Sequence, residues 1–172
     1  IYFIKNKDHR GLLISHGTGV GKTMLAVSIA DIMKDTHRVI LLSAKSLQDN
    51  FKKEIKKYMK LISKSDSEIK DSIENDYKFI SSNAGNMLTQ LSRLGKTQKE
   101  LQFEKTLGEV NNKINLENSV VIVDEAQNLF NGIVNGSKNA SGFYQSVMNA
   151  TNIKLIFLSA TPIINDPFEV VP

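Results

Sequence analysis

The sequence contains no cysteine and no tryptophan, and it has only three prolines among its 172 residues. Without cysteine, disulfide bonds, thiolate metal ligands and cysteine nucleophiles are excluded. No uninterrupted apolar run approaches the ~18 residues that a membrane-spanning helix needs. The N-terminal stretch IYFIKNK lacks the apolar segment of a signal peptide. We therefore expect a protein of a reducing compartment that does not enter a membrane.

The composition indicates one ordinary folded domain. Hydrophobic residues make up 41% of the chain and charged residues 23%, which is enough apolar material for a single core. Basic residues outnumber acidic ones by 22 to 18, a net charge of +4. This excess is too small to indicate a nucleic-acid partner by itself, and the lack of tryptophan disfavours base stacking as a main binding mode.

Short apolar runs recur along the chain and predict buried strands. They lie at residues 12–14, 39–42, 77–80, 120–123 and 155–158. Continuous apolar strands of this kind are typical of a parallel sheet that is covered by helices on both faces.

Apolar spacing between these runs predicts helices. They cover residues 24–33, 47–62, 103–114 and 139–149, and the polar stretches 63–76 and 131–139 are expected to be solvent-facing connections. Ser46 and Asp49 resemble a capping box at the start of the second helix. Strands that alternate with helices predict an α/β fold with a doubly wound, mostly parallel sheet of at least five strands.

A glycine-rich segment, HGTGVGKT at residues 16–23, follows the first predicted strand. In a P-loop the backbone N–H groups of such a turn point at phosphate oxygens, and the next helix adds its positive N-terminal end. Gly19 and Gly21 would let the backbone approach, Lys22 would reach the β and γ phosphates, and Thr23 would hold Mg²⁺. His16 stands at a position where glycine or alanine is usual, so the match is imperfect.

Two acidic residues, Asp124 and Glu125, follow the fourth predicted strand directly. A carboxylate at Asp124 suits Mg²⁺, which prefers oxygen ligands, and Glu125 could polarise an attacking water. The alternative is a helix N-terminus whose first-turn acids complement the helix dipole. A P-loop a hundred residues earlier favours the first interpretation.

Together these segments resemble a known family. The stretches HGTGVGKT, DEAQ at residues 124–127 and SAT at residues 159–161 resemble motifs I, II and III of superfamily 2 helicases, in the same chain order. The longer stretches VVIVDEAQNLF and LSATPIINDPFE resemble DExH-type NTPases of large DNA viruses, of the early-transcription-factor and nucleoside-triphosphatase-I type.

The resemblance implies a RecA-like first motor domain whose motif III strand lies between the motif I and motif II strands. It implies that ATP and Mg²⁺ bind at Gly17, Thr18, Gly19, Val20, Gly21, Lys22 and Thr23, together with Asp124 and Glu125. Motif III (Ser159, Ala160, Thr161) would couple the nucleotide to the nucleic-acid face by contacting Gln127. An amide can donate and accept hydrogen bonds but cannot become charged, so the tightness of this coupling stays open.

The resemblance also implies contacts with the sugar–phosphate backbone of DNA or RNA, without sequence readout. The implied residues are Ala44, Lys45 and Ser46 of motif Ia, and Asn83, Ala84 and Gly85 of motif Ib. The lysines on the predicted helix 47–62 could add a basic stripe, but helix periodicity alone favours a solvated face. His9 and His37 are expected at the surface, and we expect no zinc site.

Superfamily 2 motors need a second RecA-like domain, and none of the three arginines, Arg10, Arg38 and Arg93, lies in a motif VI pattern. We therefore interpret residues 1–172 as the first motor domain of a longer polypeptide in viral transcription or replication. The resemblance places it inside the cell, at a viral replication site or in the virion, with viral transcription machinery as a further partner. The alternatives are a nucleotide-dependent binding module without unwinding and a restriction- or remodelling-type translocase.

Overall fold

The computed structural model describes residues 2–6, 8–15, 17, 21–107 and 113–161, and in this part of the chain five strands form one parallel sheet. The strands are β1 (Gly11–Ser15), β2 (Arg38–Ser43), β3 (Tyr77–Ser81), β4 (Ser119–Asp124) and β5 (Lys154–Ser159), in the spatial order β1-β5-β4-β2-β3. All five predicted strands are confirmed. The strand of motif III, β5, lies between β1 and β4 as the family resemblance implied.

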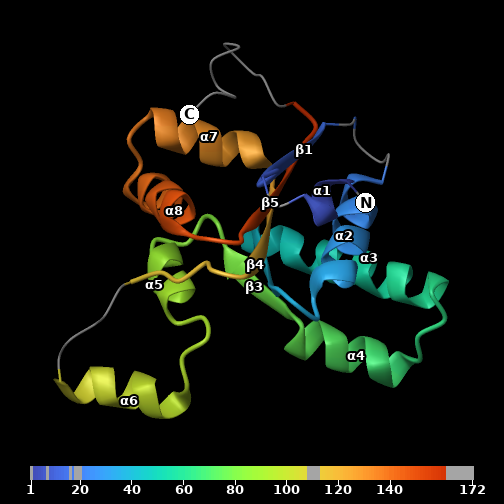
Figure 1. Ribbon diagram of the computed structural model, residues 1–172, viewed down its shortest axis with the longest axis horizontal. Helices are drawn as coiled ribbons and strands as arrows, with labels where there is room; N and C mark the ends of the chain where they lie inside the picture. The colour runs from blue at the N-terminus through green and yellow to red at the C-terminus, as the bar shows by residue number, and fades with distance from the viewer. Residues whose placement is uncertain (1, 7, 16, 18–20, 108–112, 162–172) are drawn as a thin grey trace.

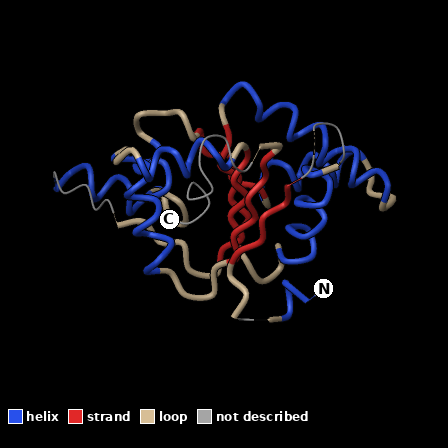
Figure 2. The backbone as a smooth tube through the Cα atoms, turned by 90° about the horizontal axis from the view of Figure 1, so that it is seen from above, coloured by secondary structure: helices blue, strands red, loops and turns tan. Residues whose placement is uncertain are grey.

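Helices cover both faces of the sheet, which Figures 1 and 2 show as a layer of strands between two layers of helices. The helices are α1 (Tyr2–Lys5), α2 (Lys22–Met33), α3 (Gln48–Leu61), α4 (Asp66–Asn75), α5 (Met87–Ser92), α6 (Gln98–Leu107), α7 (Ala126–Val134) and α8 (Lys138–Asn149), with a short 3₁₀ helix at Lys45–Leu47. Helices α2, α3 and α4 lie on one side of the sheet, and α5, α7 and α8 lie on the other. Helix α6 stands away from the sheet (Figure 1).

The alternation of side chains along each strand builds two separate cores. Leu41 and Ile122 face α2 and α3, whereas Ile40 and Val121 face the helices of the opposite layer. All four are fully buried. Because successive side chains of a strand point to opposite faces, the continuous apolar runs in the sequence supply both cores at once.

Several predicted helix boundaries are wrong. The helix expected at 103–114 corresponds to α6 (Gln98–Leu107); residues 108–112 lie outside the described residues, and residues 113 and 114 are not helical. The stretch 63–76 holds α4, and the stretch 131–139 holds the end of α7 and the start of α8. Residues 63–76 contain few apolar residues, and the buried residues of α4 are Ile69 and Ser72, so this stretch gives no helix prediction.

The capping box expected at Ser46 is also wrong. Helix α3 begins at Gln48, its N-cap is Leu47 without a side-chain cap hydrogen bond, and Asp49 pairs with Lys52 at 3.3 Å. True capping boxes open α4 and α6. Ser65 Oγ accepts from Glu68 N–H at 3.3 Å and Glu68 Oε2 accepts from Ser65 N–H at 2.8 Å, while Thr97 and Glu100 make the equivalent pair.

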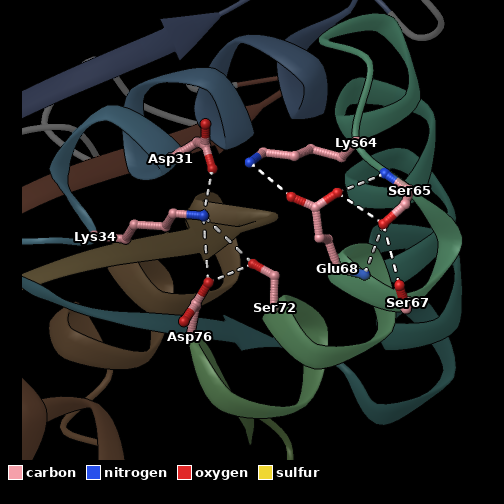
Figure 3. Close-up of polar contacts among 8 residues, drawn as sticks. All are labelled: Asp31, Lys34, Lys64, Ser65, Ser67, Glu68, Ser72 and Asp76. Atoms are coloured by element: carbon pink, nitrogen blue, oxygen red, sulfur yellow. Dashed lines mark hydrogen bonds and ion pairs between the residues drawn. The ribbon is translucent and has the colours of Figure 1, made fainter.

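Figure 3 shows the polar contacts that join α4 to α2. Lys34 Nζ lies 2.9 Å from Asp31 Oδ1 and 3.3 Å from Asp76 Oδ2, and Asp76 also accepts from the Ser72 hydroxyl. Burial opposes the charge of Lys34, but the two carboxylates outweigh it and raise the pKa of Lys34. The C-terminal end of the P-loop helix is thereby fixed against α4.

Two basic residues tie distant segments to the sheet. Lys154 is 4% exposed and donates three hydrogen bonds, to the carbonyls of Phe3 (2.9 Å), Asn6 (2.5 Å) and His9 (2.7 Å). Arg10 Nη2 donates to the carbonyls of Val147 and Ala150 at the end of α8.

No helix of the described residues combines the length and the hydropathy that a membrane crossing requires.

Candidate active site

The carboxyl ends of the five strands meet at one edge of the sheet and carry small polar or acidic residues. The last residues of the strands are Ser15, Ser43, Ser81, Asp124 and Ser159. Ser15 and Ser159 are paired in register, as are Ser43 and Ser81. Ligands of open parallel sheets bind outside this edge. Motifs I, II and III therefore lie at the edge of the sheet where a ligand-binding site is expected.

The end of the P-loop is set by Gly21, the N-cap of α2. Its φ of +80° lies in the left-handed region, which glycine adopts without steric cost. Lys22 begins the helix, and its Nζ donates to the carbonyl of Gly17 at 3.0 Å. Thr23 follows in the first turn. His16, Thr18, Gly19 and Val20, which the sequence also assigned to this loop, lie outside the described residues.

The carboxylate of Asp124 lies within the electrostatic reach of Lys22. Burial raises the pKa of Asp124, and the neighbouring charge of Glu125 raises it further. The Glu125 N–H, which donates to Asp124 Oδ1 at 3.1 Å, and the positive charge of Lys22 act in the opposite direction. The fold therefore brings together motif I and motif II, which are a hundred residues apart in the sequence.

These groups fit a divalent cation. The charge of Asp124 is only partly compensated in the protein, since burial and Glu125 still raise its pKa. Mg²⁺ takes one or two carboxylate or hydroxyl oxygens and otherwise water and phosphate oxygens. Asp124 and Thr23 could supply the protein ligands. No group of three or more His, Cys, Asp and Glu side chains suited to a metal occurs among the described residues, which is compatible with such a sparse site.

Glu125 has an unusual backbone conformation. It is the N-cap of α7 with φ 51° and ψ 52°, a region that is rare for a residue with a side chain and often marks a functional position. Its carboxylate Oε2 accepts a hydrogen bond from Gln127 Nε2 at 2.6 Å. The Gln127 side chain thus holds the Glu125 carboxylate at the turn between β4 and α7.

Gln127 joins motif II to motif III. Ser159 donates its hydroxyl hydrogen to Gln127 Oε1 at 2.7 Å, and Thr161 N–H donates to Ser159 Oγ at 3.1 Å. Gln127 is 9% exposed and Ser159 1%. The sequence expectation of a contact between these motifs is met in the structure, with the amide in the role of both donor and acceptor. Ala160 lies in the bend between Ser159 and Thr161.

The two loops expected to face nucleic acid lie side by side. Ala44, Lys45 and Ser46 follow β2, and Asn83, Ala84 and Gly85 follow β3, and Ser82 N–H donates to the Ser43 carbonyl at 2.9 Å. Lys45, Ser46, Asn83 and Gly85 are exposed. The 3₁₀ helix Lys45–Leu47 begins at this edge.

One contact to these loops was not predicted. Asn139 of α8 donates through Nδ2 to the carbonyls of Ala84 (3.1 Å) and Gly85 (3.5 Å). A cavity of about 240 Å³ lies between this loop and Glu125, and Asn128 and Asn139 contribute to its wall. No local signal identified Asn139, because its partner lies 55 residues away in the chain.

The basic face predicted for α3 is present, but nearby carboxylates neutralise part of its charge. Lys53 and Lys56 are exposed, Lys57 and Lys60 approach carboxylates, and Lys52 lies 5.3 Å from the centre of the Phe79 ring. His9 is exposed as expected. His37 is only half-exposed, and its Nδ1 lies 2.8 Å from the Thr36 hydroxyl.

Comparison with known proteins gives relatives over nearly the whole chain. Residues 1–164 match the family described as type III restriction enzyme, res subunit. A termination factor NPH-I homolog of African swine fever virus is 35% identical over 98% of this chain and 22% of its own length. A protein of Acanthamoeba polyphaga mimivirus that is named as an ATP-dependent RNA helicase is 29% identical over 98% of this chain and 29% of its own length. The chain thus spans less than a third of these relatives.

Proposed function

We propose, on the premise that this chain belongs to the family of the type III restriction enzyme res subunit, that it is the ATP-binding motor domain of a nucleic-acid-dependent ATPase. The chain belongs to that family over residues 1–164, and the five-stranded parallel sheet is its RecA-like fold. The motor would couple ATP hydrolysis to movement on DNA or RNA. Viral relatives that are named as a termination factor and as an RNA helicase support a role in viral transcription.

The observation that carries this proposal is the meeting of Lys22 and Asp124. Lys22 begins the helix that follows β1, Asp124 ends β4, and β5 lies between these two strands. Burial and the charge of Glu125 raise the pKa of Asp124, and the charge of Lys22 acts in the opposite direction. A half-buried carboxylate at the end of one strand and a P-loop lysine that follows another strand at the same edge are the arrangement expected for a triphosphate with its cation.

Each residue of the site has a role in this proposal. Lys22 and the amides at the start of α2 bind phosphate oxygens, together with Gly17, Thr18, Gly19, Val20 and Gly21. Thr23 and Asp124 hold Mg²⁺, which when bound neutralises the charge that develops on the phosphates. Glu125 orients water for attack and accepts its proton. Gln127, Ser159, Ala160 and Thr161 transmit the state of this site to the nucleic-acid face.

The proposal extends to partners outside residues 1–172. A second RecA-like domain of the same polypeptide would supply the arginine that completes the site, an addition worth 10³–10⁵ in rate in related phosphoryl transfers. Arg10 and Arg38 bind backbone carbonyls inside this domain, which supports an external source. Ala44, Lys45, Ser46, Asn83, Ala84 and Gly85 would contact the DNA or RNA backbone, within a viral replication site or the virion.

Substitution of the catalytic groups tests the function. In the polypeptide that contains the whole motor, Lys22→Ala removes the phosphate ligand and Glu125→Gln removes the proton acceptor. Each substitution should lower nucleic-acid-stimulated ATP turnover at least ~100-fold. Lys53→Ala, on the exposed face of α3, is the control and should retain full turnover. Undiminished turnover in either variant would contradict the proposal.

Unwinding and translocation need separate measurements. A strand-displacement assay reports unwinding, and displacement of a bound protein from duplex reports translocation. ATPase activity with translocation but no strand displacement would identify a translocase of the restriction or remodelling type. Nucleotide-dependent binding without either activity would identify a binding module of a transcription complex.

A further inference from the structure

One side chain of α8 is hydrogen-bonded to the loop between β3 and α5. Asn139, the second residue of α8, is half-buried, and its Nδ2 donates to the carbonyls of Ala84 at 3.1 Å and Gly85 at 3.5 Å. The Ala84 carbonyl also accepts from the N–H of Met87, the first residue of α5, at 3.0 Å. Asn139 is therefore bonded at the point where the loop turns into α5.

Close packing of α8 against α5 determines where Asn139 lies. Phe143 of α8 and Met87 of α5 are buried in the same apolar cluster. Helix α8 approaches α5 so closely at Gly142 that a Cβ there would lie 2.7 Å from Leu88 Cδ1. Asn139 is three residues before Gly142 and so lies on the same face of the helix. The packing of the two helices thus places the Asn139 donor beside the loop.

The start of α8 is also packed against α7, the helix that follows the acids of motif II. The N–H of Ser137, the N-cap of α8, donates to the Gly132 carbonyl of α7 at 2.8 Å. A Cβ on Gly132 would lie 3.0 Å from Ala140 Cβ. Glu125, Asn139 and the loop after β3 all contribute to the wall of the 240 Å³ cavity described above. Asn139 therefore connects this loop to the pair of helices that begins at Glu125.

We propose that Asn139 is a positioning residue for nucleic-acid binding, which holds residues 83–85 in the conformation that receives the sugar–phosphate backbone. The inference rests on the proposed function, in which this loop contacts DNA or RNA. Asn83 and Gly85 are exposed, whereas the amide of Asn139 donates to carbonyls of the protein itself. A loop that is already ordered loses less conformational entropy when it binds a ligand. Asn139 thus raises the affinity for nucleic acid without a contact of its own.

Stimulation of ATP turnover by nucleic acid tests this role in the polypeptide that contains the whole motor. The probe is whichever of single-stranded DNA, duplex DNA and single-stranded RNA stimulates the unsubstituted motor most strongly. Asn139→Ala should raise the nucleic-acid concentration that gives half-maximal stimulation about threefold to tenfold, the effect of one lost hydrogen bond. The maximal turnover at saturating nucleic acid should change less than about twofold.

Two further variants serve as rescue and control. Asn139→Gln keeps the amide donor on a longer side chain and should recover part of the affinity for nucleic acid. Asn149→Ala removes the same type of side chain from an exposed position near the end of α8. It should behave as the unsubstituted motor does.

Hydrogen exchange of the same variants without nucleic acid separates positioning from direct contact. In Asn139→Ala the amides of residues 82–87 should exchange faster, above all the N–H of Met87, because its acceptor is the Ala84 carbonyl. The amides of β4 should keep their exchange rates. Weaker nucleic-acid binding without faster exchange in this loop would show a direct contact of Asn139 with the ligand and would overturn the positioning role.

The outcomes also separate this inference from the proposed function. An unchanged half-maximal concentration in Asn139→Ala, in a motor that nucleic acid stimulates, would overturn the positioning role and leave the proposed function standing. A fall in maximal turnover alone would assign Asn139 to catalysis and would overturn the positioning role as well. An unsubstituted motor whose ATP turnover does not respond to nucleic acid would contradict both. Circular dichroism checks that each variant is folded.

Discussion

Gln127 shows how the polarity of one side chain determines a connection between two motifs. Its Nε2 donates to Glu125 and its Oε1 accepts from Ser159, at 2.6 and 2.7 Å. A carboxylate at this position could accept from Ser159 but could not donate to Glu125 when ionised. The amide does not titrate, so its connection to motif III keeps the same polarity at every pH at which the chain is folded.

Gln127→Glu tests this polarity. At neutral pH it places a second carboxylate against Glu125, and we expect a loss of about 2 kcal/mol in the free energy of unfolding. Repulsion and burial should raise the pKa of the new pair above its unfolded value. The variant is then less stable than the unsubstituted chain at pH values at which both carboxylates are ionised. This loss in the free energy of unfolding should become smaller as the pH falls through the raised pKa.

Urea unfolding between about pH 7 and pH 4 measures this deficit. Gln145→Glu, at an exposed position on α8, makes the same substitution on a helix that contains no acidic residue and is the control. A deficit that is equal at every pH would show that repulsion with Glu125 is not its cause.

Single helices begin where local hydrogen bonds fix them, and α4 is the clearest case. Glu68 accepts from the Ser65 hydroxyl at 2.7 Å and from the Ser65 N–H at 2.8 Å, and Lys64 Nζ approaches at 3.1 Å. These hydrogen bonds, with the Lys64 charge, lower the pKa of Glu68 to about 2. The pattern at Ser46 has the same spacing, but the chain there forms a 3₁₀ turn first, so the box does not form.

Glu68→Gln tests the cap of α4 through its pH dependence. Because the folded pKa is depressed, the ionised Glu68 stabilises the chain above its ordinary value of 4.5, and this contribution is lost as the pH falls toward 2. The stability difference between Glu68→Gln and the unsubstituted chain should therefore be present at neutral pH and disappear in acid. Denaturant unfolding over this range measures it.

The control is Glu74→Gln, at an exposed position on the same helix. It removes the same charge without touching the cap. If Glu74→Gln gave the same pH-dependent difference, the effect would come from general charge and not from the Ser65 cap.

Over the whole molecule, long-range hydrogen bonds hold the N-terminal segment to the sheet. Lys154 donates to three carbonyls more than 140 residues earlier in the chain. Burial lowers its pKa, and Asp8 partly opposes this effect. Because the ammonium satisfies three carbonyls with its three protons, the cost of burying a charge is offset by complete hydrogen bonding.

Lys154→Met keeps the length of the side chain and removes all three donors. We expect a loss of about 3 kcal/mol in the free energy of unfolding, together with faster hydrogen exchange in α1 and at the start of β1. Lys53→Met, at an exposed position on α3, should change neither. Loss of stability without faster exchange in α1 would show that Lys154 does not anchor this segment.

Local patterns in the sequence predict the five strands, which the structure confirms, and they also predict the P-loop and the acids of motif II, because each pattern depends on neighbouring residues. An apolar run of four residues is buried wherever it lies, and a glycine turn such as that at Gly21 follows from local backbone geometry. The motif resemblance added the place of β5 between β1 and β4. Helix α4 was not predicted, because its buried residues are Ile69 and Ser72 and the stretch offers few apolar residues.

The packing of the whole chain determines which distant side chains contact one another. Lys22 and Asp124 interact because β1 and β4 end at the same edge, and Asn139 reaches Ala84 because α5 and α8 cover the same face of the sheet. Such contacts depend on the simultaneous burial of many residues far apart in the chain, and no local pattern contains that information.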